Sequence, residues 1–320
     1  MKGLATGTAS FAWSAASWGA RLAARRGLLR SESLDAGRVV SIGNIQAGGS
    51  GKTPLVARVA NEARARGKSV CILCRGYGAE WETRGGLLAP NAPCNALECG
   101  DEAALLRGLA PDAWIAVGAD RVRQYARAIR AAGRAFDLVV LDDGFQHWRI
   151  RKDLEVVALT SHGPSEVLHR DFRAALGSAD LVVWTKGRER PETFDGLPMV
   201  RAKFALPRAE REGMPVWLVS GVGDPESVAE SAREAAYRVD RHLVFRDHAV
   251  YEAGMLRDLI ERSREAGARV ATTGKDWVKW RELGIAETEV IVLEPEVSIE
   301  EADRPVWEKV LWKGERWAAS

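Results

Sequence analysis

The sequence of 320 residues has few cysteines, no internal repeat and no low-complexity segment. The missing repeat excludes a solenoid. Cys71 and Cys74 have the C-x-x-C spacing of some metal sites, and Cys94 and Cys99 follow further along. A shared metal is one interpretation, but Cys71 and Cys74 lie in an apolar run that predicts a strand, where residues three apart point to opposite faces. We therefore predict buried structural thiols in a reducing compartment.

The first 30 residues lack acidic side chains, whereas they carry Lys2 and four arginines. The whole chain has a net charge of +2, so its remainder is acidic. Aromatic and aliphatic residues can form one stripe of a helix beside these arginines: Phe11, Ala15, Trp18, Leu22 and Leu29. Such a pattern is typical of a helix lying on an anionic membrane surface. We expect residues 1–35 to form this membrane-surface helical segment.

Long hydrophobic runs are also missing. The uncharged stretch at 3–20 is mostly Ala, Ser, Gly and Thr, which makes it a poor membrane span. A secretory signal would place its positive charge before the apolar run, whereas here most of the charge follows it. A helix packed on its own domain and an Arg-rich, Ser-rich organelle transit peptide stay open as alternatives.

Short β-branched runs alternate with helical stretches, which predicts an α/β protein with a mostly parallel sheet. We expect a phosphate-loop NTPase-type domain at 36–190, a linker at 191–215 where charge, proline and glycine accumulate, and a smaller α/β domain at 216–320 that closes the cleft. The strands expected in the first domain are 39–42, 70–73, 114–117, 138–141, 156–159 and 181–184.

A glycine-rich run between a strand and a helix, residues 43–54, is the strongest motif. Glycines let backbone N–H groups aim at phosphate oxygens, Lys52 can reach the terminal phosphates, and Thr53 can place its hydroxyl on Mg²⁺. The first glycine of the strict G-x-x-x-x-G-K-[ST] pattern is missing, because Gln46 stands there. The predicted ATP-binding residues are Ala47, Gly48, Gly49, Ser50, Gly51, Lys52, Thr53 and Pro54.

Two carboxylates, Asp142 and Asp143, end the apolar strand at 136–141. In a phosphate-loop enzyme the acid that holds Mg²⁺ lies at such a strand end. Adjacent aspartates also serve as turn or helix-capping residues, so metal binding depends on the loop upstream. Gln146 and His147 follow at once and face the same crevice.

Asp101 and His248 lie in two further polar clusters, Gly-Asp-Glu at 100–102 and Phe-Arg-Asp-His at 245–248. A kinase needs a group that accepts the proton of the attacking hydroxyl, and a carboxylate held by a histidine would serve. Spacing alone does not pair the two residues, and each also fits a capping or surface role. Arg75 and Arg121 could neutralise phosphate or simply be solvated.

A guanine-recognition pattern, Asn/Thr-Lys-x-Asp, is missing too. The run at 185–188 lacks the aspartate, and the run at 273–276 has the residues in another order. This weighs against a GTPase.

Together the motifs resemble those of the tetraacyldisaccharide 4′-kinase family, the lipid A 4′-kinases of Gram-negative bacteria, over nearly the whole chain. In that family the first glycine of the loop is typically missing as well. The segments that carry the resemblance are 41–45, 48–54, 75–78, 100–102, 118–121, 142–147, 245–248 and 273–279.

The resemblance implies Mg²⁺-dependent transfer of the ATP γ-phosphate to the 4′-hydroxyl of a tetraacylated glucosamine disaccharide 1-phosphate. It places the enzyme at the cytoplasmic face of the bacterial inner membrane, peripheral or monotopic. The implied partners are the lipid A disaccharide precursor and the membrane surface, with no nucleic acid, and we expect a monomer. The implied roles are a catalytic set of Asp101 as base, His248 and Lys52; a Mg²⁺ set of Thr53, Glu102 and Asp142; and a substrate set of Arg75, Arg121, Asp143, Gln146 and His147.

The chain departs from the family after the strand at 156–159. The family usually has a Gly- and Pro-rich segment with an Arg-Glu pair there, whereas this chain has a shorter segment around Gly163 that ends in Arg170 and Asp171. We expect these two residues to stand in for the pair. Two alternative functions stay open: a phosphate-loop ATPase or GTPase switch acting on a protein partner, and a kinase of a soluble sugar.

Overall fold

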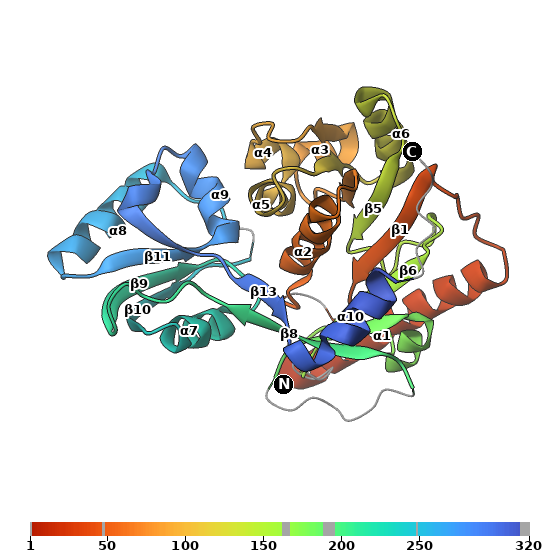
Figure 1. Ribbon diagram of the computed structural model, residues 1–320. Helices are drawn as coiled ribbons and strands as arrows, with labels where there is room; N and C mark the ends of the chain where they lie inside the picture. The colour runs from red at the N-terminus through yellow and green to blue at the C-terminus, as the bar shows by residue number, and fades with distance from the viewer. Residues whose placement is uncertain (1, 47–48, 162–166, 188–195, 248, 314–320) are drawn as a thin grey trace.

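The computed structural model describes residues 2–46, 49–161, 167–187, 196–247 and 249–313 (Figure 1). Two sheets lie side by side, each with its own helices. The larger sheet has the order β13-β8-β7-β6-β1-β5-β2-β4-β3, and its pairs are parallel except β3 with β4 and β13 with β8. Its strands are β1 (Ala36–Gly43), β2 (Val70–Cys74), β3 (Gly86–Leu88), β4 (Trp114–Val117), β5 (Phe136–Asp142), β6 (Leu154–Thr160), β7 (Leu181–Lys186), β8 (Met199–Ala205) and β13 (Glu296–Ile299).

Helices cover both faces of the larger sheet, and the smaller sheet is parallel with the order β10-β9-β11-β12. The α/β class predicted from the alternating pattern is confirmed. The helices of the larger unit are α1 (Lys2–Arg25), α2 (Lys52–Ala65), α3 (Glu80–Arg84), α4 (Ala96–Cys99), α5 (Asp101–Leu109), α6 (Arg121–Ala132), η1 (Arg173–Ser178), η3 (Glu301–Asp303) and α10 (Arg304–Leu311). The smaller unit contains β9 (Met214–Ser220), α7 (Pro225–Glu234), β10 (Tyr237–Val244), α8 (Ala253–Glu265), β11 (Arg269–Thr273), α9 (Gly274–Glu282), η2 (Glu287–Glu289) and β12 (Val290–Leu293).

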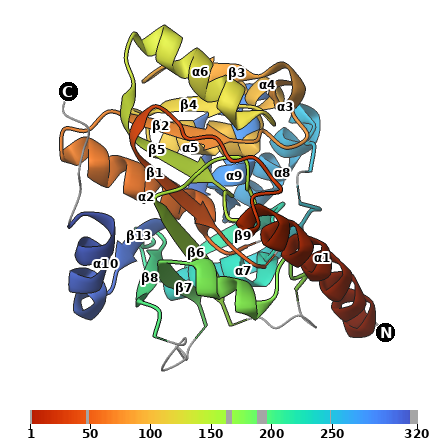
Figure 2. The same cartoon turned by 90° about the vertical axis from the view of Figure 1, so that its right-hand side faces the viewer.

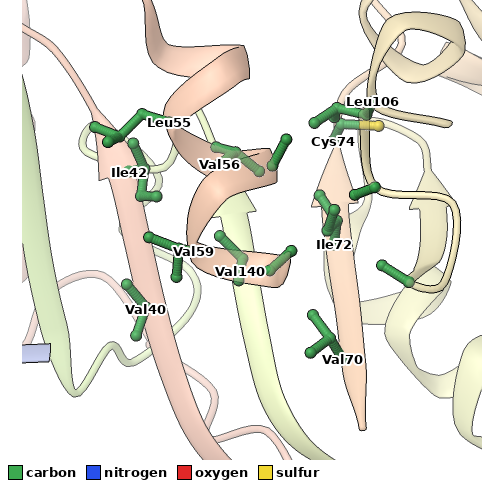
Figure 3. Packing of buried hydrophobic residues seen from close by; sticks show 14 of the residues in the cluster. Val40, Ile42, Leu55, Val56, Val59, Val70, Ile72, Cys74, Leu106 and Val140 are labelled. Carbon is green, nitrogen blue, oxygen red and sulfur yellow. The ribbon is translucent and has the colours of Figure 1, made fainter. Parts of the chain in front are cut away.

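Helix α2 fixes the position of the loop that precedes it. Its residues Leu55, Val56 and Val59 recur at helical spacing and are fully buried. Figure 3 shows them packed over β1, β5 and β2, against residues such as Ile42 and Val140. Burying each of these side chains contributes about 1.5–3 kcal/mol. The start of α2 is therefore held at the carboxyl end of the central strand β1.

The linker expected at 191–215 contains β8, which pairs with β7 as part of the larger sheet. After the smaller unit the chain returns, and β13 pairs with β8 while α10 packs on the same sheet. The smaller unit is thus inserted between β8 and β13 instead of extending to residue 320. The prediction missed β8 because its apolar residues alternate with Arg201 and Lys203, a short signal among charged neighbours.

The prediction of buried free thiols is confirmed for one pair of cysteines and wrong for the other. Cys71 and Cys74 are free and buried on β2, and burial raises the pKa of both thiols. Cys94 and Cys99, expected as free thiols, form a disulfide across the short helix α4. The chain turns at Asn95 into α4, and this turn brings Cys94 against Cys99, a contact that strand spacing does not predict.

Helix α1 lies along the larger unit, and Figure 2 shows its N-terminal end projecting from the body. Its docked side combines polar contacts with the ring of Trp18, which packs on Phe172 and the core beside β7. Ser10 Oγ accepts from the backbone N–H of His169 at 2.9 Å, and Arg21 is ion-paired with buried Asp171 at 2.6 Å. Its outer side carries Phe11, which is 68% exposed, together with exposed Trp13 and Leu22.

The part of the chain that the structure describes contains no helix that is both long and apolar enough to span a membrane.

Candidate active site

The loop between β1 and α2 leaves a helix N-terminus open toward the crevice. Gly49 (φ 50°) and Gly51 (φ 71°) adopt the left-handed conformation, and a Cβ on Gly51 would come 2.5 Å from the Phe204 ring. Gly51 caps α2 without a side-chain bond, so the first N–H groups of the helix stay available. This is the geometry of an anion site. Ala47 and Gly48, also predicted to bind ATP, lie outside the described residues.

Gln46 stands where the strict motif has glycine, and its side chain ties the loop to the end of β6. Its Oε1 accepts from the backbone N–H of Thr160 at 2.9 Å, and its Nε2 donates to the Thr160 carbonyl at 3.2 Å. Gln46 is 3% exposed. A glycine could not make these bonds, so the departure from the motif has a structural role in this chain.

Side chains of the loop are bonded to one another and to the strand end beside them. Asn44 Nδ2 donates to Ser50 Oγ at 2.9 Å, and Lys52 Nζ lies 3.5 Å from the same hydroxyl. Lys52 Nζ is also 3.9 Å from the carboxylate of Asp143. Gln146 Nε2 donates to the Asn44 carbonyl at 2.9 Å, so this predicted substrate residue supports the loop. The structure therefore brings the two strongest sequence motifs together.

Asp142 ends β5 and is 2% exposed, yet its Oδ2 has no hydrogen-bond partner among the described residues. Burial, together with the charges of Glu102 and Asp143, raises its pKa to about 7, although Lys52 and Arg121 oppose this. A buried carboxylate oxygen without a partner is costly and indicates a missing ligand.

Mg²⁺ fits this place. It takes oxygen ligands and is usually held by one or two carboxylates together with substrate phosphates and water. Asp142 supplies the unpartnered oxygen, Glu102 is close enough to perturb its pKa, and Thr53 lies in the first turn of α2. Among the described residues no group of three or more His, Cys, Asp or Glu side chains could hold a metal ion. Asp142, Glu102 and Thr53 would supply some of the ligands of Mg²⁺, and substrate phosphates and water would supply the others.

Asp143 differs from its neighbour because it is surrounded by cations. It has a left-handed backbone (φ 52°), and Arg170 donates to both of its oxygens at 2.7 and 3.1 Å. Burial would raise the pKa of Asp143, but Lys52 and Arg170 outweigh it and lower the value to about 2. Arg170 also bonds Asn44 of the loop. Arg170, which we expected to stand in for part of the family's Arg-Glu pair, thus joins the phosphate loop to the end of β5.

The predicted arginines occupy different environments. Arg121 is 6% exposed and donates to the main-chain carbonyl of Asp142 at 2.7 Å, beneath the carboxylates, and burial lowers its pKa. Arg75 is on the surface, where its Nε lies 2.7 Å from Glu82. Arg121 is therefore part of the strand-end cluster, whereas Arg75 is engaged by a neighbouring acid.

His147 lines a cavity of about 510 Å³ between α1 and the segment after β5. Burial and the charge of Arg121 lower its pKa to about 3, so the ring is neutral. Arg30 and Arg149 line the same cavity. The basic end of the N-terminal segment thus lies beside a predicted substrate residue.

Asp101 is the first residue of α5 and follows Gly100, whose backbone is left-handed (φ 90°). It lines a cavity of about 580 Å³ between the two units, together with Asp247 and Ala249. His248 lies outside the described residues, so its predicted pairing with Asp101 is not tested. The residues on both sides of position 248 do share a cavity with Asp101.

Two features of the site were missed from the sequence. Lys279 of α9 is ion-paired with Asp101 at 2.8 Å. The segment at 273–279 carries part of the family resemblance, but the sequence assigned Lys279 no role in the site. A second cavity, of about 210 Å³, adjoins Gly49 and Gly51 and has apolar walls that include Phe204 and Val222. Glu294 also lines this cavity.

Comparisons with known proteins agree with this geometry. Residues 7–313 match the family described as tetraacyldisaccharide-1-P 4′-kinase (LpxK). The tetraacyldisaccharide 4′-kinase of Geobacter metallireducens is 35% identical over 81% of this chain and 82% of its own length. That of Geobacter sulfurreducens is 34% identical over 81% and 78%.

A crystal structure of LpxK from Aquifex aeolicus in complex with ATP shares the fold. It has a TM-score of 0.73 and 22% identity, and the match covers 97% of this chain and 100% of that one. With a phosphate loop, a buried strand-end carboxylate and an interdomain cavity in place, and with the family model spanning residues 7–313, the chain belongs to the tetraacyldisaccharide-1-P 4′-kinase family.

Proposed function

We propose that this phosphotransferase moves the γ-phosphate of ATP to the 4′-hydroxyl of a tetraacylated glucosamine disaccharide 1-phosphate in lipid A biosynthesis. The observation that carries the reaction class is the unpartnered, buried Oδ2 of Asp142 beside Lys52 and the phosphate loop. Family membership supports the acceptor.

On the nucleotide side, residues 49–54 and the N-terminus of α2 bind the phosphates, and Lys52 neutralises their charge. Arg170 and Asp143 hold the loop against the strand end. Asp142, Glu102 and Thr53 would hold Mg²⁺, and the ion would supply positive charge against the charge that develops during transfer. The apolar cavity beside Gly49 and Gly51 takes the adenine base.

On the acceptor side, Asp101 accepts the proton of the 4′-hydroxyl, and His248 assists it. The cavity that Asp101 shares with Asp247 and Ala249 takes the sugar. Positioning of acceptor and donor across the cleft supplies much of the rate, because phosphoryl transfer needs little covalent chemistry from the protein. Two further proposed substrate residues lie elsewhere: Arg121 supports the strand end at Asp142, and His147 lines the cavity beside α1.

The proposed location is the cytoplasmic face of the inner membrane, with helix α1 lying on the membrane surface. The proposed oligomeric state is a monomer. The outer side of α1 exposes Phe11 (68%) and Trp13 (52%), while Ser10, Arg21 and Trp18 dock the other side. Exposed aromatic residues with nearby arginines suit an interfacial helix.

The membrane role is tested by sedimentation with anionic vesicles. Serine at both Phe11 and Trp13 lowers the bound fraction several-fold, whereas Val244→Ser, which changes an exposed residue of β10, leaves it unchanged. Equal binding of all three proteins contradicts the membrane role.

The reaction is tested with γ-labelled ATP, Mg²⁺ and the tetraacylated disaccharide 1-phosphate in detergent micelles. Wild-type protein labels the lipid, Asp101→Asn labels it much less, and Asp112→Asn, which changes an exposed acid, behaves like wild type. Release of labelled phosphate without labelled lipid would instead support a hydrolytic switch. Equal labelling of the disaccharide without acyl chains would indicate a soluble sugar kinase.

A further inference from the structure

Lys279 makes bonds on both sides of the cleft between the two units. Its Nζ lies 2.8 Å from Asp101 Oδ2, on the first residue of α5, and donates to the Ala249 carbonyl at 3.0 Å. The side chains of Lys279 and Asp101 are 13% and 14% exposed. A single ammonium group thus joins the predicted base of the larger unit to the main chain beside position 248.

The helix that carries Lys279 is held firmly in the smaller unit. Asp276, three residues earlier, is fully buried and accepts from the Gly221 N–H at 2.9 Å, the Thr273 hydroxyl at 2.7 Å and the Tyr251 hydroxyl at 2.8 Å. These bonds fix the start of α9 and the segment that leads to Tyr251. Lys279 therefore extends from a rigid support, and the Ala249 carbonyl is placed by the same network.

Helix α9 contacts the larger unit at a second point. Glu282, also on α9, accepts from the backbone N–H of Ala96 at the start of α4. α4 directly precedes Gly100 and Asp101. The contacts of α9 with Ala96 and with Asp101 lie before and after the turn at Gly100, so α9 holds both ends of this turn.

We propose that Lys279 is a positioning residue: its ammonium group holds the Asp101 carboxylate and the Ala249 carbonyl together and so fixes the two sides of the acceptor site relative to each other. The inference rests on the proposed function for the role of Asp101. An ammonium group has three donors, which is enough for both acceptors. Without it, the Asp101 carboxylate and the Ala249 carbonyl would face each other as two acceptors.

The first experiment compares Lys279→Met, Lys279→Arg and Arg281→Met, which changes an exposed cation of the same helix. We expect kcat for lipid phosphorylation to fall about 10- to 100-fold in Lys279→Met, because small misplacement of reacting groups has effects of this size. The KM for ATP stays within about twofold. Lys279→Arg recovers most of kcat, and Arg281→Met equals wild type. A higher KM for ATP with an unchanged kcat overturns the proposal.

A double variant asks whether Lys279 acts through Asp101. If it does, adding Lys279→Met to Asp101→Asn lowers the residual rate by less than about threefold, because the two residues then share one interaction. Multiplication of the two single losses would show that Lys279 acts elsewhere and would contradict the proposal.

A third measurement does not depend on lipid phosphorylation, so it separates this proposal from the proposed function. Hydrogen exchange followed by mass spectrometry should show faster exchange at 249–252 and 101–105 in Lys279→Met than in wild type, with Arg281→Met unchanged. Unchanged exchange in Lys279→Met contradicts the positioning role, whatever the activity. The exchange difference between Lys279→Met and wild type could also appear while the wild-type protein fails to label the lipid. That result would support the Lys279 contact and overturn the assigned acceptor.

Discussion

The nucleotide side and the acceptor side of the site are built in different ways. At the phosphate loop, residues beside the strand ends of the larger sheet are bonded to one another within a single unit, as in the contacts of Gln46 with Thr160 and of Arg170 with Asp143. On the acceptor side, Asp101 of the larger unit is ion-paired with Lys279 of the smaller unit, across the cleft.

This difference teaches where the two halves get their order. The phosphate loop is preorganised by the core under α2, within the larger unit, whereas the apolar cavity beside it also has walls from the smaller unit, such as Val222. The acceptor side exists as a site only while the two units are together. Substitutions on the first side should therefore remove chemistry directly, whereas those on the second should act through the arrangement of the units.

The largest expected effect is on the nucleotide side. Lys52→Met should lower kcat about a thousandfold, because it removes the charge that faces the transferred phosphate. Steady-state labelling of the lipid measures it, with Lys203→Met as control, since Lys203 is 61% exposed on β8. A loss no larger than that of Lys279→Met would erase the contrast between the two sides.

The next effect is on stability and tests how firmly the larger unit is held. Arg21→Met leaves the buried charge of Asp171 unpaired, so the free energy of unfolding should fall by roughly 3 kcal/mol. Urea titration followed by circular dichroism measures it. The double variant Arg21→Met, Asp171→Leu should regain most of the loss. A single variant as stable as wild type would mean that α1 contributes nothing to this unit.

A smaller effect is expected from Arg170→Lys, which keeps the charge but loses the paired bonds to Asp143. Arginine and lysine differ at such two-pronged contacts, so we expect kcat/KM for ATP to fall about tenfold. Arg173→Lys, an exposed position nearby, serves as the control and should match wild type. Equal kinetics for both variants would show that the nucleotide side does not depend on this contact.

The smallest effect concerns Glu294, an acid that lines the cavity beside Gly49 and Gly51. Burial raises the pKa of Glu294 from 4.5 to about 7. Between these values the folded state keeps a proton that the unfolded state has lost, so stability falls as the pH rises. Glu294→Gln should therefore raise the free energy of unfolding at pH 8 by roughly 1–2 kcal/mol, allowing for partial exposure, and change little at pH 4. The same gain at both pH values would contradict this origin.

The sequence was sufficient where chemistry follows from neighbouring residues. The glycine-rich loop and the strand that ends at Asp142 were predicted because strand, loop and helix are consecutive, and parallel strands bring their carboxyl ends to one edge. The α/β class followed from the same alternation.

The sequence was insufficient to predict contacts between residues that are distant along the chain. The bonds of Arg170 to Asn44 and of Lys279 to Asp101 depend on how whole elements pack, and no local pattern encodes them. The strand β8 was missed because a two-residue alternation with charged neighbours is a weak signal on its own.

The docking of α1 has a consequence for geometry. Arg21 holds Asp171, and the next residue along the chain, Arg170, holds both Asp143 and the loop residue Asn44. A helix joined in this way sets the height and tilt of the phosphate loop above any surface on which the helix lies. A helix without the Arg21 contact could lie on the same surface, but it would no longer fix the orientation of the phosphate loop relative to that surface.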